Sequence, residues 1–157
     1  MFERCKQWIG RWFPISDRFL LGASSFESDT LGKAGEKAAA NYLQKLGYSI
    51  LARGHRQRLG EIDLIALDGK WIVFVEVKTW TSSQGGDPSL AVDRRKQEKL
   101  TRAALIYLKR HGLLEHPARF DVVSIVWPNS PNTVKSDPTF RHFKSAFDAV
   151  GSGQMFR

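Results

Sequence analysis

Residues Gly60–Trp80 read GEIDLIALDGKWIVFVEVKTW and contain two β-rich runs, separated by Asp68 and Gly69. An Asp-Gly pair between two such runs is the strongest short-range signal for a β-hairpin. This stretch therefore predicts two antiparallel strands joined by a two-residue loop. We expect the rest of the chain to be organised around this hairpin.

The register of the hairpin decides where its acidic side chains meet. We expect Leu67 to pair with Lys70 across the two-residue loop. In that register Asp63 faces Phe74 and is a diagonal neighbour of Glu76, at roughly 7–8 Å between backbones. A four-residue loop would instead place Asp63 directly opposite Glu76. Both loops keep the two carboxylates on one face, because side chains alternate across a strand.

The two faces of the predicted hairpin differ in composition. One face is wholly apolar and must be buried; it carries Ile62, Leu64, Ala66, Trp71, Val73, Val75 and Val77. The other face is apolar near the turn, and charged residues gather at its far end, namely Glu61, Asp63, Glu76 and Lys78. Burying like charges together is expensive unless something pairs them. The far end of the hairpin is therefore a candidate site, and an ordinary half-solvated sheet edge with salt bridges is the alternative.

Asp63 and Glu76 are near enough in either register to share a divalent cation. Carboxylate oxygens with few other protein ligands suit Mg²⁺ or Mn²⁺, which keep several waters and accept substrate phosphates. Lys78 lies on the same face, two residues beyond Glu76, where it can orient a metal-bound water and neutralise a phosphate. Glu61 faces Glu76 in the expected register, as a further ligand or as the partner of a neighbouring arginine.

Hydrophobic periodicity and capping signals predict the remaining elements. The fold class is α/β, a mixed sheet flanked by helices. The expected elements are helix Leu31–Leu46, strand Tyr48–Gln57, helix Val92–His111, strand Arg119–Trp127 and a short closing helix Phe140–Val150. Asp121 shares a strand face with Val123 and Ile125, so it is expected to pair with a basic residue or a helix amide in a structural role.

Four segments carry a resemblance to a known family. They are Gly32-x-x-Gly35-Glu36, then Gly60-Glu61-Ile62-Asp63-Leu64-Ile65, then Phe74-Val75-Glu76-Val77-Lys78, then Arg119-Phe120-Asp121-Val122-Val123. Together they resemble the YraN-like family of bacterial proteins, which is assigned to the PD-(D/E)XK nuclease superfamily beside archaeal Holliday-junction resolvases. The resemblance covers residues 30–148. It implies a restriction-endonuclease-like αβββαβ core and Mg²⁺-dependent cleavage of nucleic acid phosphodiesters.

The resemblance also implies roles for individual residues. Asp63 and Glu76 would hold the metal, and Lys78 would act on the attacking water. Glu36 would join the metal site through a water, and its place at the border of the buried stripe of helix Leu31–Leu46 lets it lean over the charged end of the sheet. A solvated Glu36 is the alternative. Trp80 stands where the family often has a basic residue.

Basic residues just before the hairpin are candidate phosphate contacts. Arg53, Arg56 and Arg58 gather there, and a solvated, positively charged strand end is the alternative for each of them.

Helix Val92–His111 supplies further basic candidates. Lys96 and Gln97 extend its buried stripe by one turn, so we expect them to point at the site, with Lys96 steadying a phosphate. A snorkelling lysine is the alternative for Lys96. Arg95 belongs to the basic outer surface of this helix.

Composition limits the number of domains, the kind of partner and the location that we expect. The chain has 157 residues, 42% of them hydrophobic, which is enough for one domain with a core. A formal charge of +8 favours a polyanionic partner such as nucleic acid. Cys5 stands alone, and no apolar run approaches the roughly 20 residues of a membrane helix, so we expect a protein of the reducing cytoplasm.

Three parts divide the chain. Residues 1–28 form an aromatic arm that packs on the domain, joins a second copy or lies on a membrane surface; residues 29–150 form the nuclease-like domain and 151–157 a flexible tail. Thr81–Pro88 is a turn-rich loop, either a lip over substrate or a plain connection. A homodimer is expected by analogy with junction resolvases.

The predicted function is a Mg²⁺-dependent endonuclease acting on DNA, branched or junction DNA among its substrates. Two alternatives remain open from the residues. One is a nucleic-acid-binding protein that has the fold without efficient cleavage. The other is an interaction protein that works through the aromatic arm.

Overall fold

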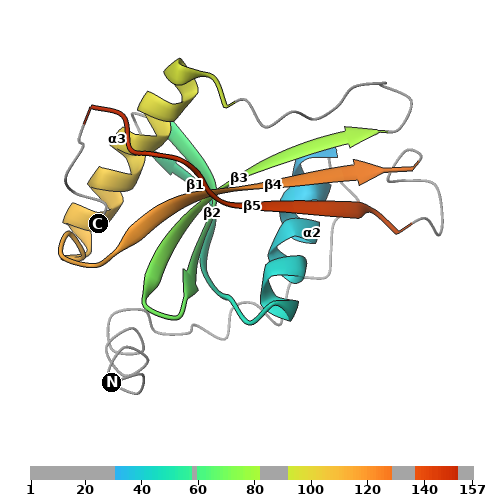
Figure 1. Cartoon of the computed structure of the whole chain (residues 1–157), viewed down its shortest axis with the longest axis horizontal. Coiled ribbons are helices and arrows are strands. Elements are labelled where there is room, and N and C mark those ends of the chain that lie inside the picture. The colour runs from blue at the N-terminus through green and yellow to red at the C-terminus, as the bar shows by residue number, and fades with distance from the viewer. Residues whose placement is uncertain (1–30, 58–59, 82–91, 129–136, 152–157) are drawn as a thin grey trace.

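The computed structural model describes residues 31–57, 60–81, 92–128 and 137–151, drawn as coloured ribbon in Figure 1. The aromatic arm, Arg58, most of the Thr81–Pro88 loop and the tail predicted from the sequence lie outside these residues. No helix in the described part of the chain is both long and apolar enough to cross a membrane.

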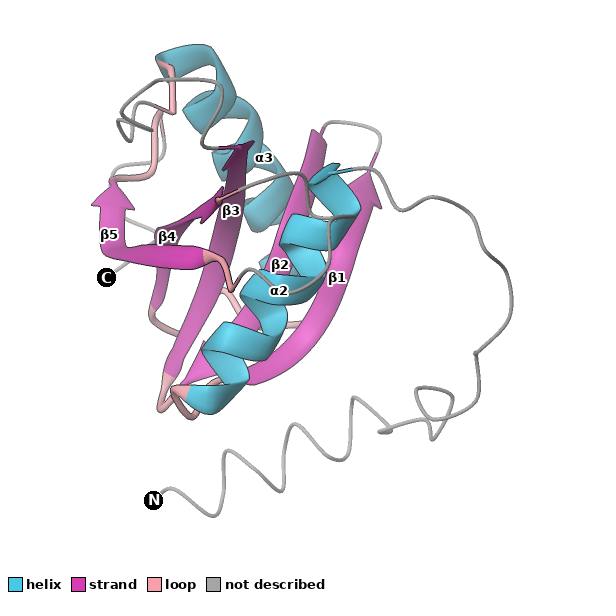
Figure 2. Cartoon of the chain, turned by 90° about the vertical axis from the view of Figure 1, so that its right-hand side faces the viewer, coloured by secondary structure: helices cyan, strands magenta, loops and turns pink. Residues whose placement is uncertain are grey.

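Five strands form one mixed sheet with a helix on each face (Figures 1 and 2). The elements are α2 (Leu31–Lys45), β1 (Ser49–Gln57), β2 (Gly60–Asp68), β3 (Trp71–Thr81), α3 (Arg94–Arg110), β4 (Ala118–Trp127) and β5 (Thr139–Phe147). The strands follow the order β1-β2-β3-β4-β5, and only the β3–β4 pair is parallel. The predicted α/β class is confirmed, and the arrangement is consistent with a restriction-endonuclease-like core.

Each helix fills one side of the sheet with an apolar core. The α3-side core includes Ile62, Ile65, Ile72, Phe74, Leu100, Ala103, Ala104, Tyr107, Leu108, Phe120 and Val122. The α2-side core includes Ala39, Ala40, Leu43, Tyr48, Leu64, Ala66, Val73, Val75, Val123 and Ile125. The predicted faces of the hairpin are therefore found, with Ile62 as the exception, because it packs on the α3 side although Leu64 packs on the α2 side. The regular alternation breaks at Asp63, which lies between them.

Close backbone approaches set the two helices over one end of the hairpin. On α2, a Cβ at Gly35 would overlap Oγ1 of Thr79 near the end of β3, so glycine is required for this contact. On the other face, a Cβ at Gly60 would lie 3.4 Å from the carbonyl oxygen of Lys99 in α3. The start of α3 is fixed by Asp93, whose side chain accepts a hydrogen bond from the amide of Lys96 at 2.8 Å.

The register of the hairpin differs from the predicted one by two residues. Leu67 pairs with Ile72 rather than with Lys70, and Asp68 pairs with Trp71. The loop is therefore Gly69-Lys70, with Gly69 at a φ of 59°, a conformation that glycine adopts without steric cost. This is the register that a four-residue loop would have produced.

A contact from outside the hairpin explains the shift. Arg119 on β4 donates a hydrogen bond of 2.7 Å to Oδ2 of Asp68, and another of 3.0 Å to the hydroxyl of Tyr48. Asp68 is thus held as the last residue of β2 and does not enter the turn. In consequence Glu61 does not face Glu76 as predicted, but lies opposite Arg56 of β1.

The predicted closing helix Phe140–Val150 is wrong, because most of this segment is strand β5. It pairs antiparallel with β4, with Phe140 opposite Ile125 and Phe143 opposite Val122. Tertiary pairing overrides the weak helical pattern here, since β4 is apolar on both faces and its free edge needs hydrogen-bonding partners. Phe140 and Phe143 then pack on the α2-side and α3-side cores respectively.

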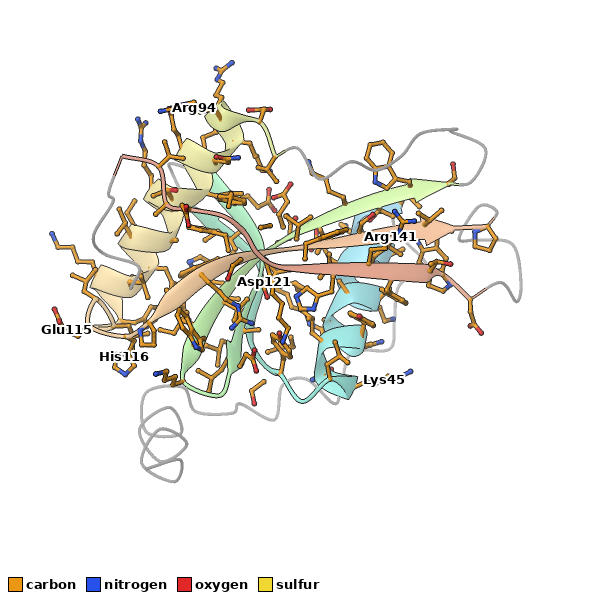
Figure 3. All side chains as sticks on the ribbon, viewed as in Figure 1. Lys45, Arg94, Glu115, His116, Asp121 and Arg141 are labelled. Atoms are coloured by element: carbon orange, nitrogen blue, oxygen red, sulfur yellow. The ribbon has the colours of Figure 1, made fainter. Side chains whose placement is uncertain are left out.

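Asp121 of β4 is fully buried and fully paired on the α2 side, near the centre of the molecule in Figure 3. It accepts hydrogen bonds from Arg119 Nε at 3.0 Å, from the Ser145 amide at 2.9 Å and from His142 Nε2, whose ring nitrogen lies 2.9 Å away. Burial by itself would raise the pKa of Asp121, but these three partners outweigh burial and lower it. Arg119 is the basic partner that the sequence predicted for Asp121. The backbone amide that bonds Asp121 belongs to Ser145 of strand β5 and not to a helix.

Candidate active site

Strands β2 and β3 separate at the end of the hairpin away from its turn, as Figure 2 shows. Their last backbone pair is Leu64 with Val75. Continued by one residue, this register sets Asp63 opposite Glu76. In place of a further backbone bond, the amide of Val77 donates to Oδ2 of Asp63 at 2.7 Å. The carboxylate of Asp63 therefore lies between the two strands, where side chains from both helices can reach it.

The environment of Asp63 favours its neutral form. Burial is the largest cause and the charge of Glu76 is the second; together they raise the pKa of Asp63 from 3.8 to about 7. The Val77 hydrogen bond and the charge of Lys96 act in the opposite direction, and Glu36 adds a further increase. A raised pKa of this origin marks a carboxylate that lacks positive charge, which a bound cation would supply.

Glu76 is the most buried acid of this site, with 5% of its side chain exposed. Lys78 Nζ lies 3.3 Å from its Oε1, and Lys96 Nζ lies 3.2 Å from its Oε2. Oε2 is nevertheless buried without a hydrogen bond, because the contact with Lys96 has the distance of an ion pair but not hydrogen-bond geometry. Lys96 therefore pairs with Oε2 by charge alone, and Oε2 keeps a lone pair for another ligand.

Glu36 approaches from α2, on the other side of the sheet. Its neighbour Gly35 makes the close contact with Thr79 that brings this part of the helix down onto β3. Glu36 is half-buried, and its charge contributes to the raised pKa of Asp63. Its Oε2 lies 3.8 Å from where a Cβ of Gly54 would stand in β1. The divergence of the strands thus lets a carboxylate from the α2 side act on a site that faces α3.

The acidic side chains of the site decide which metal ion it could bind. No group of three or more His, Cys, Asp or Glu side chains in the described residues is arranged to hold a metal. Two carboxylates, Asp63 and Glu76, are available as direct ligands, and one of their buried oxygens has no hydrogen-bond partner. Mg²⁺ usually binds one or two protein carboxylates and keeps several water ligands. The residues present therefore fit Mg²⁺ or Mn²⁺.

The structure gathers five of the predicted site residues and separates the others. Asp63, Glu76, Lys78, Lys96 and Glu36 come together at the diverging strands. Gln97 instead bonds to the segment before its own helix, where its Nε2 donates to the carbonyl of Val92 at 2.7 Å. Arg95 is exposed on the first turn of α3, and Arg53 lies opposite Leu64 in β1. Glu61 of β2 is in backbone register with Arg56 of β1, and Arg58 lies outside the described residues.

Two polar residues near the site were missed from the sequence. Ser124 of β4 lies in register with Lys78, and its buried hydroxyl oxygen has no hydrogen-bond partner. Arg141 of β5, labelled in Figure 3, lies opposite Ser124 and is exposed. The available signal was that Ser124 is a polar residue in a strand that is otherwise apolar on the same face. Arg141 had no signal, because its segment was expected to be a helix.

Comparison with known proteins places the chain among relatives of similar size. The model of a family described as "Uncharacterised protein family UPF0102" matches residues 35–125. A UPF0102 protein of Rhodopirellula baltica is 47% identical over 155 residues, which cover 97% of this chain and 88% of the relative. One from Geobacter metallireducens is 44% identical over 124 residues, covering 79% of this chain and 97% of the relative. One from Symbiobacterium thermophilum is 52% identical over 98 residues, or 62% and 83% of the two chains.

Proposed function

The chain belongs to the UPF0102 family, and we propose that it is a Mg²⁺- or Mn²⁺-dependent endonuclease of the PD-(D/E)XK type that hydrolyses DNA phosphodiesters. Branched or junction DNA is the favoured substrate class. The observation that carries the proposal is half-buried Asp63 opposite buried Glu76, with Lys78 and Lys96 against Glu76, where two adjacent strands separate. The pKa of Asp63, which burial and the charge of Glu76 raise to about 7, supports this assignment.

Each residue of the site has a distinct task. Asp63 and Glu76 hold the cation, with Glu36 acting through a water. A bound Mg²⁺ supplies Lewis acidity to the phosphate and makes a water a stronger nucleophile. Lys78, whose Nζ lies 3.3 Å from Glu76 Oε1, donates hydrogen bonds that orient the attacking water. Lys96, on the other oxygen of Glu76, balances negative charge that develops on the phosphate.

The surroundings of the site supply positive charge for the DNA backbone. The start of α3 carries Arg94 and Arg95, both exposed, and Lys99 follows one turn later on the same helix. With the formal charge of +8 for the whole chain, this surface attracts a polyanion and makes binding depend on salt. Cytoplasmic location and a homodimer, which would place two sites on one junction, complete the proposal.

The direct test is a cleavage assay with end-labelled linear duplex, flapped duplex and four-way junction DNA, in Mg²⁺, in Mn²⁺ and in EDTA. We expect nicking of the branched substrates only when metal is present. Asp63→Asn keeps an acceptor for the Val77 amide but loses the charge, so it should abolish cleavage, as should Glu76→Gln. Lys78→Ala should slow cleavage by about 10²–10⁴-fold. The control Glu98→Gln, which removes a half-exposed acid on α3, should leave the rate unchanged.

Cleavage that persists in EDTA, or in both acid variants, would contradict this assignment. Binding without cleavage is the second candidate function, and one observation favours it. Each oxygen of Glu76 already has a lysine within 3.3 Å, so the charge of this carboxylate is balanced without any cation. That candidate predicts steeply salt-dependent DNA binding by the wild type, with no product in any metal.

A further inference from the structure

Trp80 extends the line of site residues along β3. It follows Lys78 by two residues and Glu76 by four, so all three side chains point to the same face of the strand. The distance from Glu76 to Trp80 along the strand is about 13 Å, from a rise of about 3.3 Å per residue. Any extended polymer that reaches the carboxylates along β3 would pass the indole ring.

Trp80 differs from the other two tryptophans in the described residues. Trp71 and Trp127 pack against the α2-side core. Among the described residues, Trp80 packs against neither core, and its side chain is half-buried. Its indole nitrogen is buried without a hydrogen-bond partner, as is that of Trp127. The flat face of a half-exposed aromatic ring can stack on another flat ring. The position therefore suggests that the ring has a partner outside the protein.

The neighbouring strands add positive charge beside this ring. Lys78 is in register with Ser124 of β4, which is in turn opposite Arg141 of β5. Trp80 is in register with Val126, which lies opposite Thr139. An exposed guanidinium two strands away from Lys78, with an aromatic ring next to that row, is the pairing of groups that binds single-stranded nucleic acid. Phosphates bind the cations, and a base stacks on the ring.

We propose that Trp80 stacks on an unpaired base of the DNA strand whose phosphodiester lies at Asp63 and Glu76, and that Arg141 holds a phosphate of the same strand. This inference rests on the proposed function and narrows its substrate class to DNA with a single-stranded segment beside the cut. Stacking recognises the flat face that every base has, so the subsite binds without sequence preference.

The test measures binding in EDTA, so that metal-dependent cleavage plays no part. A short oligo(dT) and a duplex of equal length are titrated into the full chain while tryptophan fluorescence is recorded. Trp80→Ala should weaken oligo(dT) binding by about 10-fold or more, the size of one lost stacking contact. It should change duplex binding far less. Trp80→Phe keeps an aromatic face, so it should bind oligo(dT) nearly as well as wild type but lose most of the quenching.

The matched control is Trp127→Phe, because Trp127 ends the adjacent strand, in register with Thr81, and packs on the opposite face of the sheet. This variant should keep both the affinity and most of the quenching. Equal oligo(dT) affinity in wild type and Trp80→Ala, or full quenching in Trp80→Phe, would overturn the stacking role while metal-dependent cleavage remained intact. No binding of oligo(dT) by the wild type would overturn this inference, and the absence of metal-dependent cleavage in the assay above would overturn the proposed function.

Discussion

Asp121 on β4 and Asp63 on β2 lie on opposite faces of the sheet with β3 between them, and their environments are opposite. Asp121 of β4 is in register with Val75, the residue before Glu76. On the α2 side, Asp121 accepts hydrogen bonds from Arg119, from His142 and from a backbone amide, and its pKa is lowered. On the α3 side, Asp63 has one amide donor and a neighbouring carboxylate, and its pKa is raised to about 7.

Burial by itself acts to raise the pKa of both acids, so burial does not decide which of them serves structure and which is available for chemistry. The deciding quantity is the number of donors and positive charges that each carboxylate already has. Both carboxylate oxygens of Asp121 already accept hydrogen bonds, so Asp121 cannot bind a further ligand. Asp63 has one amide donor and no salt-bridge partner in the described residues, and Glu76 has two lysines but one oxygen without a hydrogen bond, so the pair can take a further ligand. The comparison separates a structural ion pair from a candidate metal site.

The largest expected effect is on the structural side. Asp121→Asn removes the fully buried charge that pairs with Arg119 and His142 and leaves Asp68 as the remaining anionic partner of Arg119, so it should lower the free energy of unfolding by about 3–5 kcal/mol. Urea denaturation of the variant and the wild type measures this. The control Glu98→Gln breaks the exposed Arg94–Glu98 pair and should change stability by less than about 0.5 kcal/mol. Similar effects for the two variants would contradict the distinction drawn for Asp121.

Asp63→Asn should instead raise the free energy of unfolding. Because the pKa of Asp63 is raised from 3.8 to about 7, the folded protein keeps a proton that the unfolded chain loses, so the free energy of unfolding falls as pH rises through this window. Asp63→Asn removes the penalty and keeps an acceptor for the Val77 amide. At pH 8 without metal it should be more stable than wild type, by on the order of 2–4 kcal/mol. Near pH 4 the two should be alike.

Urea midpoints of wild type and Asp63→Asn, measured in EDTA across this pH range, check the sign. Parallel pH profiles would mean that Asp63 does not have the raised pKa on which the comparison rests. Asp121→Asn should show the reverse trend, losing relative stability above rather than below its lowered pKa.

A divalent cation bound by Asp63 and Glu76 should stabilise the folded protein. Mn²⁺ at about 100 times its dissociation constant should raise the free energy of unfolding by about 2.7 kcal/mol, because only the folded chain brings the two carboxylates together. Thermal melts with Mn²⁺ or EDTA measure the difference. Glu76→Gln should lose the response and Glu98→Gln should keep it. An equal Mn²⁺ response in Glu76→Gln would place the cation elsewhere.

Local pattern was enough to predict most elements but not their exact pairing. The helices, the hairpin and β4 follow from apolar periodicity, which reports the face that each segment buries. The hairpin register was missed by two residues because the Arg119–Asp68 contact joins residues far apart in the chain. Strand β5 was missed because its main reason to be a strand is the free edge of β4.

The amino-acid sequence by itself determined which residue types meet at the far end of the hairpin. Alternation along two strands is a property of neighbouring residues, and it sets Asp63, Glu76 and Lys78 on one face in any even register. Only the tertiary structure decided that β2 and β3 separate there, that Lys96 from α3 reaches Glu76, and that Glu36 from α2 acts on Asp63. Those contacts depend on strand twist and on how closely each helix packs, which local periodicity does not encode.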